Sequence, residues 1–457
     1  MIARLRERLR HDDAGITIVE VIVAMVIFAV VATGFVYTML SVLSVTRDSR
    51  ARAVAANLAA EEVDLARDAA DLFALVDETR SVEINNDTFH VTRRTSWVTN
   101  PDEEFNCGGA GGIGAAAGSN LRYKRVNVTV TWDGMRPSTD PVRSDTVINP
   151  DSRINDPTLG TIIVSVLNGA GTGSQGVSVS TSPSAGAAIA STDSQGCSYV
   201  LKVTPKSYTV TVSRSGYVDS TQQATSSQTV SVVAGQSTTV AFQYDRSATF
   251  NTRMASTAPT GLTVRVPTNL QTTFTNTYGD FNRTPTGGSG TRSQAFPLHP
   301  FSTGYQAFAG TCPAANPSKW PEQVVGAQTF RADLPPAQAA LGGAATTVDV
   351  PMGLVTVAGG GSGTYLRAEL VDVTGPGLPA LCNTTQSLTF GNVLGGSPTT
   401  IALPYGTWKL YRGGSTSQTT LVPAASIAPL APAVPERTLI ASDGAITFDP
   451  RVAVVAP

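Results

Sequence analysis

The feature that most constrains this chain is an apolar run of thirty residues, 16–45, that carries a single charge, Glu20. As a helix the run would extend ~45 Å at about 1.5 Å per residue, which exceeds the roughly 30 Å of a bilayer's hydrocarbon core. Hydropathy alone predicts an uncleaved signal anchor. However, a carboxylate in a membrane helix costs on the order of 2.5 kcal/mol at the bilayer centre and persists where something pairs with it. No basic residue lies near Glu20 in the run, so its cation must come from elsewhere.

A short polar leader, residues 1–15, precedes the run and ends at Gly15. Its arginines favour a cytoplasmic location by the positive-inside tendency, so the chain after the helix should face outward. No A-x-A-like cleavage site follows the run, where Arg47 and Asp48 come next. We therefore expect the apolar helix to be retained rather than removed as a secretory signal.

The stretch from Gly15 to Glu20 resembles the processing site of type IV pilins and pseudopilins. In that family a prepilin peptidase cuts after the glycine, methylates the new amino terminus, and leaves glutamate as the fifth residue of the mature chain. The resemblance implies cleavage between Gly15 and Ile16, N-methylation of Ile16, and pairing of Glu20 with the amino terminus of a neighbouring subunit. Ile16 departs from the family pattern, which more often has phenylalanine, methionine or leucine there.

Residues 47–79 consist of strong helix formers without Gly or Pro, which predicts that the helix continues to about Thr79. The predicted 16–79 helix is thus a transmembrane and amphipathic assembly helix. Its second half has an apolar face at helical spacing, made of Val54, Leu58, Leu65, Ala69, Leu72 and Val76. The opposite side is predicted to be a solvated surface, with Glu61, Glu62, Asp64, Arg67, Asp68 and Asp71.

Alternating or β-rich segments follow at 81–97, 122–132 and 142–148, and they predict strands. A long helix followed by a small antiparallel sheet, here residues 80–150, resembles the head of minor pilins and of the smaller pseudopilins of type II secretion. Gly109, Gly111 and Gly114 formally fit a dinucleotide fingerprint. An acidic turn precedes them and a strand follows, so the βαβ context is missing and a flexible loop is the better interpretation.

Residues 151–158 read as a linker, and residues 159–245 are wholly β in pattern. This segment resembles the carboxypeptidase-regulatory-like family of extracellular β-sandwiches. The resemblance rests on the turn from Ser191 to Gly196, on Pro205 with Tyr208, and on Gly216 with Tyr217. Ser207, where the family usually has glycine, and Cys197 are departures from the pattern. The family is structural, so the resemblance implies a spacer or displayed domain with no catalytic residues.

A proline followed closely by an aromatic strand recurs at Pro300 with Tyr305 and at Pro404 with Trp408. The spacing of ~100 residues suggests further sandwich modules, which we place at 246–325 and 326–413. Residues 414–457 are predicted to form a Pro/Ala-rich tail with a final strand at 445–455. The fold class expected is therefore an α+β pilin-like N-terminal domain, with a long helix and a small antiparallel sheet, followed by all-β sandwich modules.

Four widely spaced cysteines lack C-x-x-C spacing, and outside the membrane we expect them to pair. Three connectivities are open. Order along the chain favours two of these pairs, Cys107 with Cys197 and Cys312 with Cys382.

The composition gives little support for a catalytic, metal-binding or nucleic-acid-binding site. The three histidines, His11, His90 and His299, are far apart in sequence, so a His-based triad or a zinc site has little support. We expect no enzyme, cofactor or metal. A net charge of -2 provides no strong field to recruit nucleic acid.

The sequence thus predicts a minor pilin-like or pseudopilin subunit, held in the cytoplasmic membrane before assembly and on the cell surface or in an extracellular fibre afterwards. Its expected partners are prepilin peptidase, other pilin or pseudopilin subunits and the membrane. A surface ligand such as carbohydrate, protein or DNA stays open. The alternative is a membrane-anchored surface protein that binds through its sandwiches and never polymerises.

Overall fold

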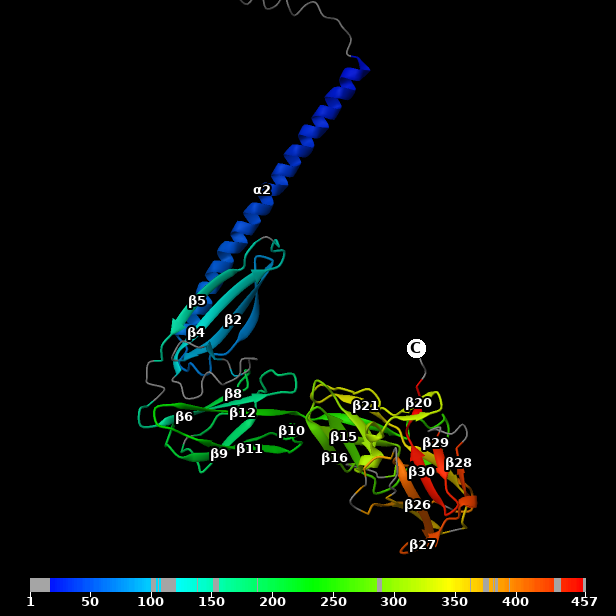
Figure 1. Cartoon of the computed structure of the whole chain (residues 1–457). Helices are drawn as coiled ribbons and strands as arrows, with labels where there is room; N and C mark the ends of the chain where they lie inside the picture. Colours follow the sequence, from blue (N-terminus) through cyan, green and yellow to red (C-terminus); the bar gives the residue numbers. More distant parts are fainter. Residues whose placement is uncertain are drawn as a thin grey trace, which may run out of the picture. The chain divides into compact units, whose positions relative to one another are not determined.

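The structure is a computed structural model, and Figure 1 shows its helix and strands. It describes residues 17–99, 104–105, 107, 121–137, 139–150, 156–186, 188–285, 290–361, 363–372, 378–380, 382, 385–393, 395–430 and 437–454. The leader with Gly15 and Ile16, most of the glycine-rich loop and most of the predicted linker lie outside these residues. The chain divides into two compact units, Met1–Val98 with Arg122–Ser152 and Thr99–Leu121 with Arg153–Pro457.

The predicted fold class is confirmed: a long N-terminal helix packs on an antiparallel sheet, and many small β-sheets follow. The helix, α2, spans Ile18–Arg67, so the expected end at Thr79 is wrong. Asp68 caps it, with its amide donating to Asp64 O at 3.0 Å. The Asp71 carboxylate then accepts the Phe73 amide at 2.8 Å. Such side-chain bonds offer the backbone an alternative to the helix, which a search for Gly and Pro does not detect.

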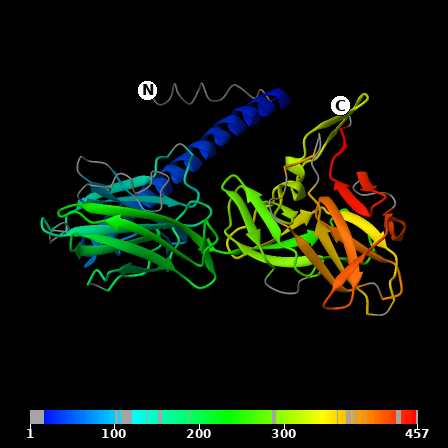
Figure 2. The ribbon, with the colours of Figure 1, turned by 60° about the horizontal axis from the view of Figure 1, so that its bottom comes forward.

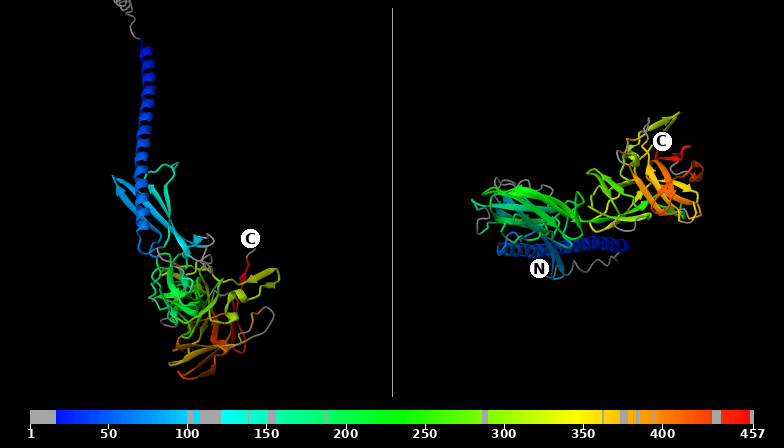
Figure 3. Two further views of the ribbon diagram at one scale, coloured as in Figure 1. Left: turned by 90° about the vertical axis from the view of Figure 1, so that its left-hand side faces the viewer. Right: turned by 90° about the horizontal axis from the view of Figure 1, so that it is seen from below.

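The buried face of α2 also differs from the predicted one. Leu65 is 55% exposed, whereas the face against the sheet is built mainly of small residues: Ala51, Ala55, Leu58, Ala59, Glu62, Val63 and Ala66. Alanine adds little to an apolar count, yet it allows the helix to approach the sheet closely. Only Leu58 is common to both sets and fully buried. Figure 3 shows the sheet along this second half of the helix, while the first half projects away from it.

Glu62, predicted to be solvated, is 3% exposed. Its two carboxylate oxygens accept from two strands of the sheet: Arg80 Nη2 at 3.0 Å and Arg93 Nη1 at 2.6 Å. Arg93 is further held by the Val76 carbonyl and by Glu78. A buried carboxylate is tolerated when it is paired and hydrogen-bonded. The ion pair therefore connects the helix to the sheet from within their interface.

The antiparallel sheet of the first unit has the order β1-β2-β4-β5, and a short fifth strand, β3 (Glu104–Phe105), pairs with β2. Its strands are β1 (Glu78–Ile84), β2 (Asp87–Thr99), β4 (Leu121–Trp132) and β5 (Val142–Ile148). Segments 122–132 and 142–148 match β4 and β5, but segment 81–97 is divided between two strands. Asn85 and Asn86, with φ of 53° and 66°, form a two-residue turn between them. Positive φ at both central residues is what a type I′ hairpin requires, and Asn tolerates it.

Seven strands at the start of the second unit form two sheets on one core, shown in Figure 2. One sheet has the order β10-β12-β6-β8 and the other β11-β9-β7. Their bounds are β6 Gly160–Leu167, β7 Ser178–Ser182, β8 Cys197–Val203, β9 Ser207–Ser213, β10 Tyr217–Asp219, β11 Thr225–Ser231 and β12 Ser237–Arg246. Apolar residues alternate with hydroxyl-bearing ones along β9, which buries one face and exposes the other.

The rest of the second unit shares one core that runs from Ala248 to Phe448. The boundary expected at 325/326 is wrong, because β13 (Ala248–Met254) pairs in parallel with β21 (Ala345–Val350). The expected Pro/Ala-rich tail is also integrated: β30 (Ala445–Asp449) pairs with β26 (Gly406–Gly413).

The other strands are β14 Val264–Arg265, β15 Thr272–Asn276, β16 Gly279–Arg283, β17 Ser293–Leu298, β18 Gln306–Ala309, β19 Gln323–Val325, β20 Gln328–Arg331, β22 Gly353–Val357, β23 Tyr365–Leu370, β24 Ser387–Asn392, β25 Thr399–Leu403, β27 Gln418–Leu421, β28 Ile427–Pro429, β29 Arg437–Ile440 and β31 Val452–Ala453.

The recurring proline and aromatic pattern has a common structural basis. Tyr208 donates its hydroxyl to Thr204 O at 3.0 Å, Tyr305 to His299 O at 2.8 Å, and Trp408 donates its indole N–H to Pro404 O at 2.9 Å. Each ring is at most 2% exposed, and each polar atom satisfies a carbonyl beside the proline. A buried aromatic needs such a partner, so the pattern marks a local anchor at each of the three places.

We predict that Glu62→Ala destabilises the first unit by about 3 kcal/mol, because Arg80 and Arg93 lose the buried carboxylate that balances their charge. Amide hydrogen exchange of β1 and β2 in the full chain measures the effect. Glu61→Ala, at an exposed position on the same helix, is the matched control and should stay near the unsubstituted value. Equal exchange rates in the two variants would show that the buried ion pair contributes nothing.

Candidate functional site

The most unusual surface of the described chain is the first half of α2. Its large apolar side chains are exposed throughout, with Ile18 at 80%, Phe28 at 74% and Tyr37 at 75%. A soluble domain rarely exposes a continuous apolar surface of this extent. Within the described residues, α2 is the one helix long and apolar enough to cross a membrane.

The helix start is organised by a capping box. The Glu20 amide donates to the Thr17 hydroxyl at 3.2 Å, and the Glu20 carboxylate accepts from the Thr17 amide at 3.4 Å. This reciprocal arrangement satisfies two backbone donors that a helix start otherwise leaves free. The single acid of the apolar half is thus directed back toward its own helix start, where the helix dipole also favours negative charge.

The free half of the helix ends where loops of the head contact it. Arg136 Nη2 donates to Ser44 Oγ at 2.7 Å, and Thr139 donates to Asp48 at 3.5 Å. Arg47 pairs with Asp87 at the hairpin turn. The segment 18–43 therefore lacks these contacts, and its length of ~39 Å at about 1.5 Å per residue exceeds a hydrocarbon core of roughly 30 Å.

Both cysteine pairs form disulfides in the structure, Cys107 with Cys197 and Cys312 with Cys382. These are the pairs favoured by order along the chain. Cys107 and Cys197 are 1% and 2% exposed, and Cys312 and Cys382 are 3% and 4% exposed. All four belong to the second unit.

A second group of titratable side chains is buried around His299. The His299 amide donates to Gln222 Oε1 at 2.7 Å, and Gln222 Nε2 donates to the Tyr305 hydroxyl at 2.8 Å. The His299 ring lies 3.1 Å from the Val218 carbonyl through Nδ1. Burial lowers the pKa of His299 and raises the pKa of Tyr305. Both groups are therefore held neutral in a network that joins the β10–β11 loop to residues 299–305.

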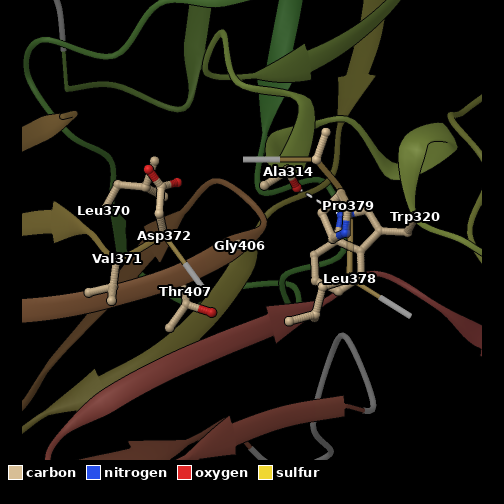
Figure 4. A pocket seen from close by; sticks show the side chains of 10 residues that line it. Ala314, Trp320, Leu370, Val371, Asp372, Leu378, Pro379, Gly406 and Thr407 are labelled. Atoms are coloured by element: carbon tan, nitrogen blue, oxygen red, sulfur yellow. Dashed lines mark hydrogen bonds between the residues drawn. The ribbon is translucent and has the colours of Figure 1, made fainter. Parts of the chain in front are cut away.

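Two pockets among the described residues have few ionisable groups in their lining. The pocket in Figure 4 has a volume of about 20 Å³ and is lined partly by Trp320, Asp372 and Thr407, so it has room for about one water. Its indole N–H already donates to Ala314 O at 2.8 Å. A larger groove of about 460 Å³ has Asp245 as its single carboxylate, and Gly169 donates its amide to that group. Among the described residues that line these two pockets, no acid/base pair is assembled.

We predict that Thr17→Ala raises the exchange rate of the Glu20 amide roughly fivefold, since loss of an N-cap hydroxyl costs about 1 kcal/mol. Hydrogen exchange of the full chain in detergent micelles measures it. Thr17→Ser keeps the hydroxyl and should retain the slow rate. Fast exchange in both variants, or in neither, would contradict the capping role.

We predict that the second unit loses thermal stability as the pH falls below about 6.5, the value for an unperturbed histidine. His299 has a lowered pKa in the folded state, so the unfolded chain takes up the proton first and is stabilised relative to the folded chain. Thermal unfolding at a series of pH values measures the slope. His299→Gln should flatten it, whereas His90→Gln, in the first unit, should not. Equal slopes for the unsubstituted chain and His299→Gln would refute the assignment.

A comparison with known protein families supports the assignment of the amino-terminal part of the apolar helix. Residues 10–36, which include Gly15, Ile16 and Glu20, match the prokaryotic N-terminal methylation motif. This motif is the amino-terminal signature of type IV pilins and pseudopilins, and the match covers only the start of the chain. None of the curated proteins matches the sequence.

Three solved structures are similar to parts of the chain at low identity. The Bacillus anthracis TIE protein is 12% identical, with 74% of this chain and 68% of that chain covered and a TM-score of 0.18. A streptococcal ancillary pilin is 10% identical, with 50% and 76% covered and a TM-score of 0.19. The major pilin subunit of Bacillus cereus is 10% identical, with 65% and 95% covered and a TM-score of 0.19. Such low TM-scores carry no argument, and the likeness to pilins is confined to the amino-terminal motif at residues 10–36.

Proposed function

We propose that this chain is a minor type IV pilin-like or pseudopilin subunit that is stored in the cytoplasmic membrane through α2 and displays its second unit outside the cell. The observation that carries the proposal is the exposed apolar half of α2, with Glu20 as its one charge, inside a matched methylation motif. A surface helix of an isolated soluble protein would bury such a face. A lipid bilayer first, and the helices of other subunits later, provide the missing cover.

Processing supplies the cation that Glu20 lacks. Cleavage by prepilin peptidase after Gly15 would create an amine on Ile16, the residue before Thr17. In the described chain the Glu20 carboxylate hydrogen-bonds to Thr17 of its own helix start, which supplies no positive charge. A charge in a low-dielectric environment is strongly stabilised by an opposite charge. The pairing of Glu20 with the amine of a neighbouring subunit would then set the axial position of each new subunit.

The size of the second unit favours a minor position in a fibre. Residues Arg153–Pro457 follow the head, and one such extension on every subunit would crowd a helical assembly. We propose that residues 159–245 are a carboxypeptidase-regulatory-like spacer. Its support is the two-sheet core of β6–β12, in which Tyr208 is 2% exposed. Adhesion, secretion and uptake are the roles that such a display would serve.

The proposal predicts that the native protein begins at N-methylated Ile16 and that Glu20→Gln keeps processing but loses incorporation into a fibre. Mass spectrometry of the amino terminus and quantification of sheared surface fibres measure the two effects. We expect a decrease of about tenfold or more, equivalent to about 1.4 kcal/mol. Glu61→Gln, on the exposed side of the same helix, is the control and should assemble normally.

Two results would contradict this proposal. A native protein that begins at Met1 would exclude pilin-type processing. Normal surface display of Glu20→Gln, without any fibre, would instead identify an anchored surface protein that does not polymerise.

A further inference from the structure

The connection between β2 and β4 has an unusual place in the chain. Residues Thr99–Leu121 are an insertion between two strands of the head, yet they belong to the second unit. The chain therefore passes between the two units after Val98, returns before Arg122, and passes over again after Ser152. A single linker is enough to join two domains. The connection after Ser152 would therefore suffice to attach the second unit to the head.

Two residues of this insertion form β3 (Glu104–Phe105), which pairs with β2, and Cys107 is held by residues of the second unit. Cys107 is 1% exposed and bonded to Cys197, which begins β8. The Cys107 carbonyl accepts from the Ser165 hydroxyl at 2.9 Å, and Ser165 of β6 is itself the ladder partner of Cys197. The insertion is thus attached at one point by both a covalent bond and a buried hydrogen bond.

We propose that this insertion is a disulfide-locked clasp that retains the second unit on the membrane-anchored head independently of the linker at 151–158. A bond between residues 90 positions apart restricts the unfolded chain and so favours the docked insertion. A cut in the linker then leaves the two units joined through Cys107 and Cys197. The clasp concerns retention of the displayed unit and operates whether or not the protein enters a fibre.

The clasp closes by oxidation outside the cytoplasm. Two thiols, on Cys107 and Cys197, lose two protons and two electrons to a disulfide of an envelope thiol oxidant, which is reduced to its dithiol. Cytosolic thiols stay reduced. The lock therefore forms only after export, once the head and the sandwich lie on the same side of the membrane.

The second disulfide of the chain is a matched control. Cys312 and Cys382 are also buried in the second unit, but both lie after Ser152. A cut at the linker therefore leaves them on the same fragment. Substitution of these two cysteines removes a disulfide of the same unit and leaves the bond between Cys107 and Cys197, which joins the two fragments, intact.

The test uses the full chain in membrane vesicles, with a protease recognition sequence inserted between Ser152 and Arg153. After cleavage and washing, the carboxy-terminal fragment should remain with the membranes and run with the amino-terminal fragment on a non-reducing denaturing gel. Addition of dithiothreitol to the cleaved, folded protein should raise the released fraction at least about tenfold, and Cys107→Ser with Cys197→Ser should release it without reductant. Cys312→Ser with Cys382→Ser should be retained like the unsubstituted chain.

Release of the unsubstituted fragment without reductant would overturn the proposal, because the bond would then not join the two fragments. Retention after dithiothreitol at the unreduced level would overturn it too, since the lock would not be the disulfide. The dithiothreitol arm starts from folded protein, so a folding defect in a cysteine variant cannot decide the outcome. The assay requires neither cleavage at Gly15 nor a fibre, so its failure is distinguishable from failure of the pilin proposal.

Discussion

The docking of one half of a continuous helix onto a sheet is the interaction on which the rest of the first unit depends. An α-helix of fifty residues has no intrinsic reason to be divided at its middle. The division arises because the alanines on the second half pack against buried side chains of β2 and β4, while Glu62 pairs with Arg80 and Arg93 and Arg67 donates to Thr146 on β5. Loop contacts at Ser44, Arg47 and Asp48 mark the point at which the head begins. The described residues before that point expose their apolar side chains, and the proposed function assigns their cover to lipid or to other helices.

The same division explains why two glutamates of the helix, Glu62 and Glu20, lie in different environments. Glu62 is buried and fully paired by arginines of the head, so it acts within one subunit. Glu20 caps its own helix start in a segment that has no head around it. A carboxylate with no cation partner in the apolar half is stable only if a partner arrives. The proposed processing step provides one, the new amino terminus of a neighbouring subunit.

In the second unit, by contrast, strands that are far apart in the sequence pair with each other. Strands that begin near Ala248 pair with strands near Ala345, and the last strands complete sheets begun much earlier. The buried network of Gln222, His299 and Tyr305 joins the sandwich to this larger core. The disulfide between Cys107 and Cys197 likewise joins segments 90 positions apart within this unit. The second unit therefore contains a seven-stranded sandwich with its own core and a larger core built from segments far apart in the sequence.

The sequence by itself determined the features that depend on local pattern. The apolar run, the acid at Glu20 and the alternation in β4 were readable, because membrane length, charge and period two are properties of neighbouring residues. The sequence only favoured one of three cysteine connectivities. Only the tertiary structure decided that Glu62 is buried, that α2 ends at Arg67, and that residues 248–448 share one core. Those outcomes depend on which distant strands pair and on which side of a helix another element lies. Alanine, paired acids and parallel ladders leave little trace in composition, so no local pattern specifies them.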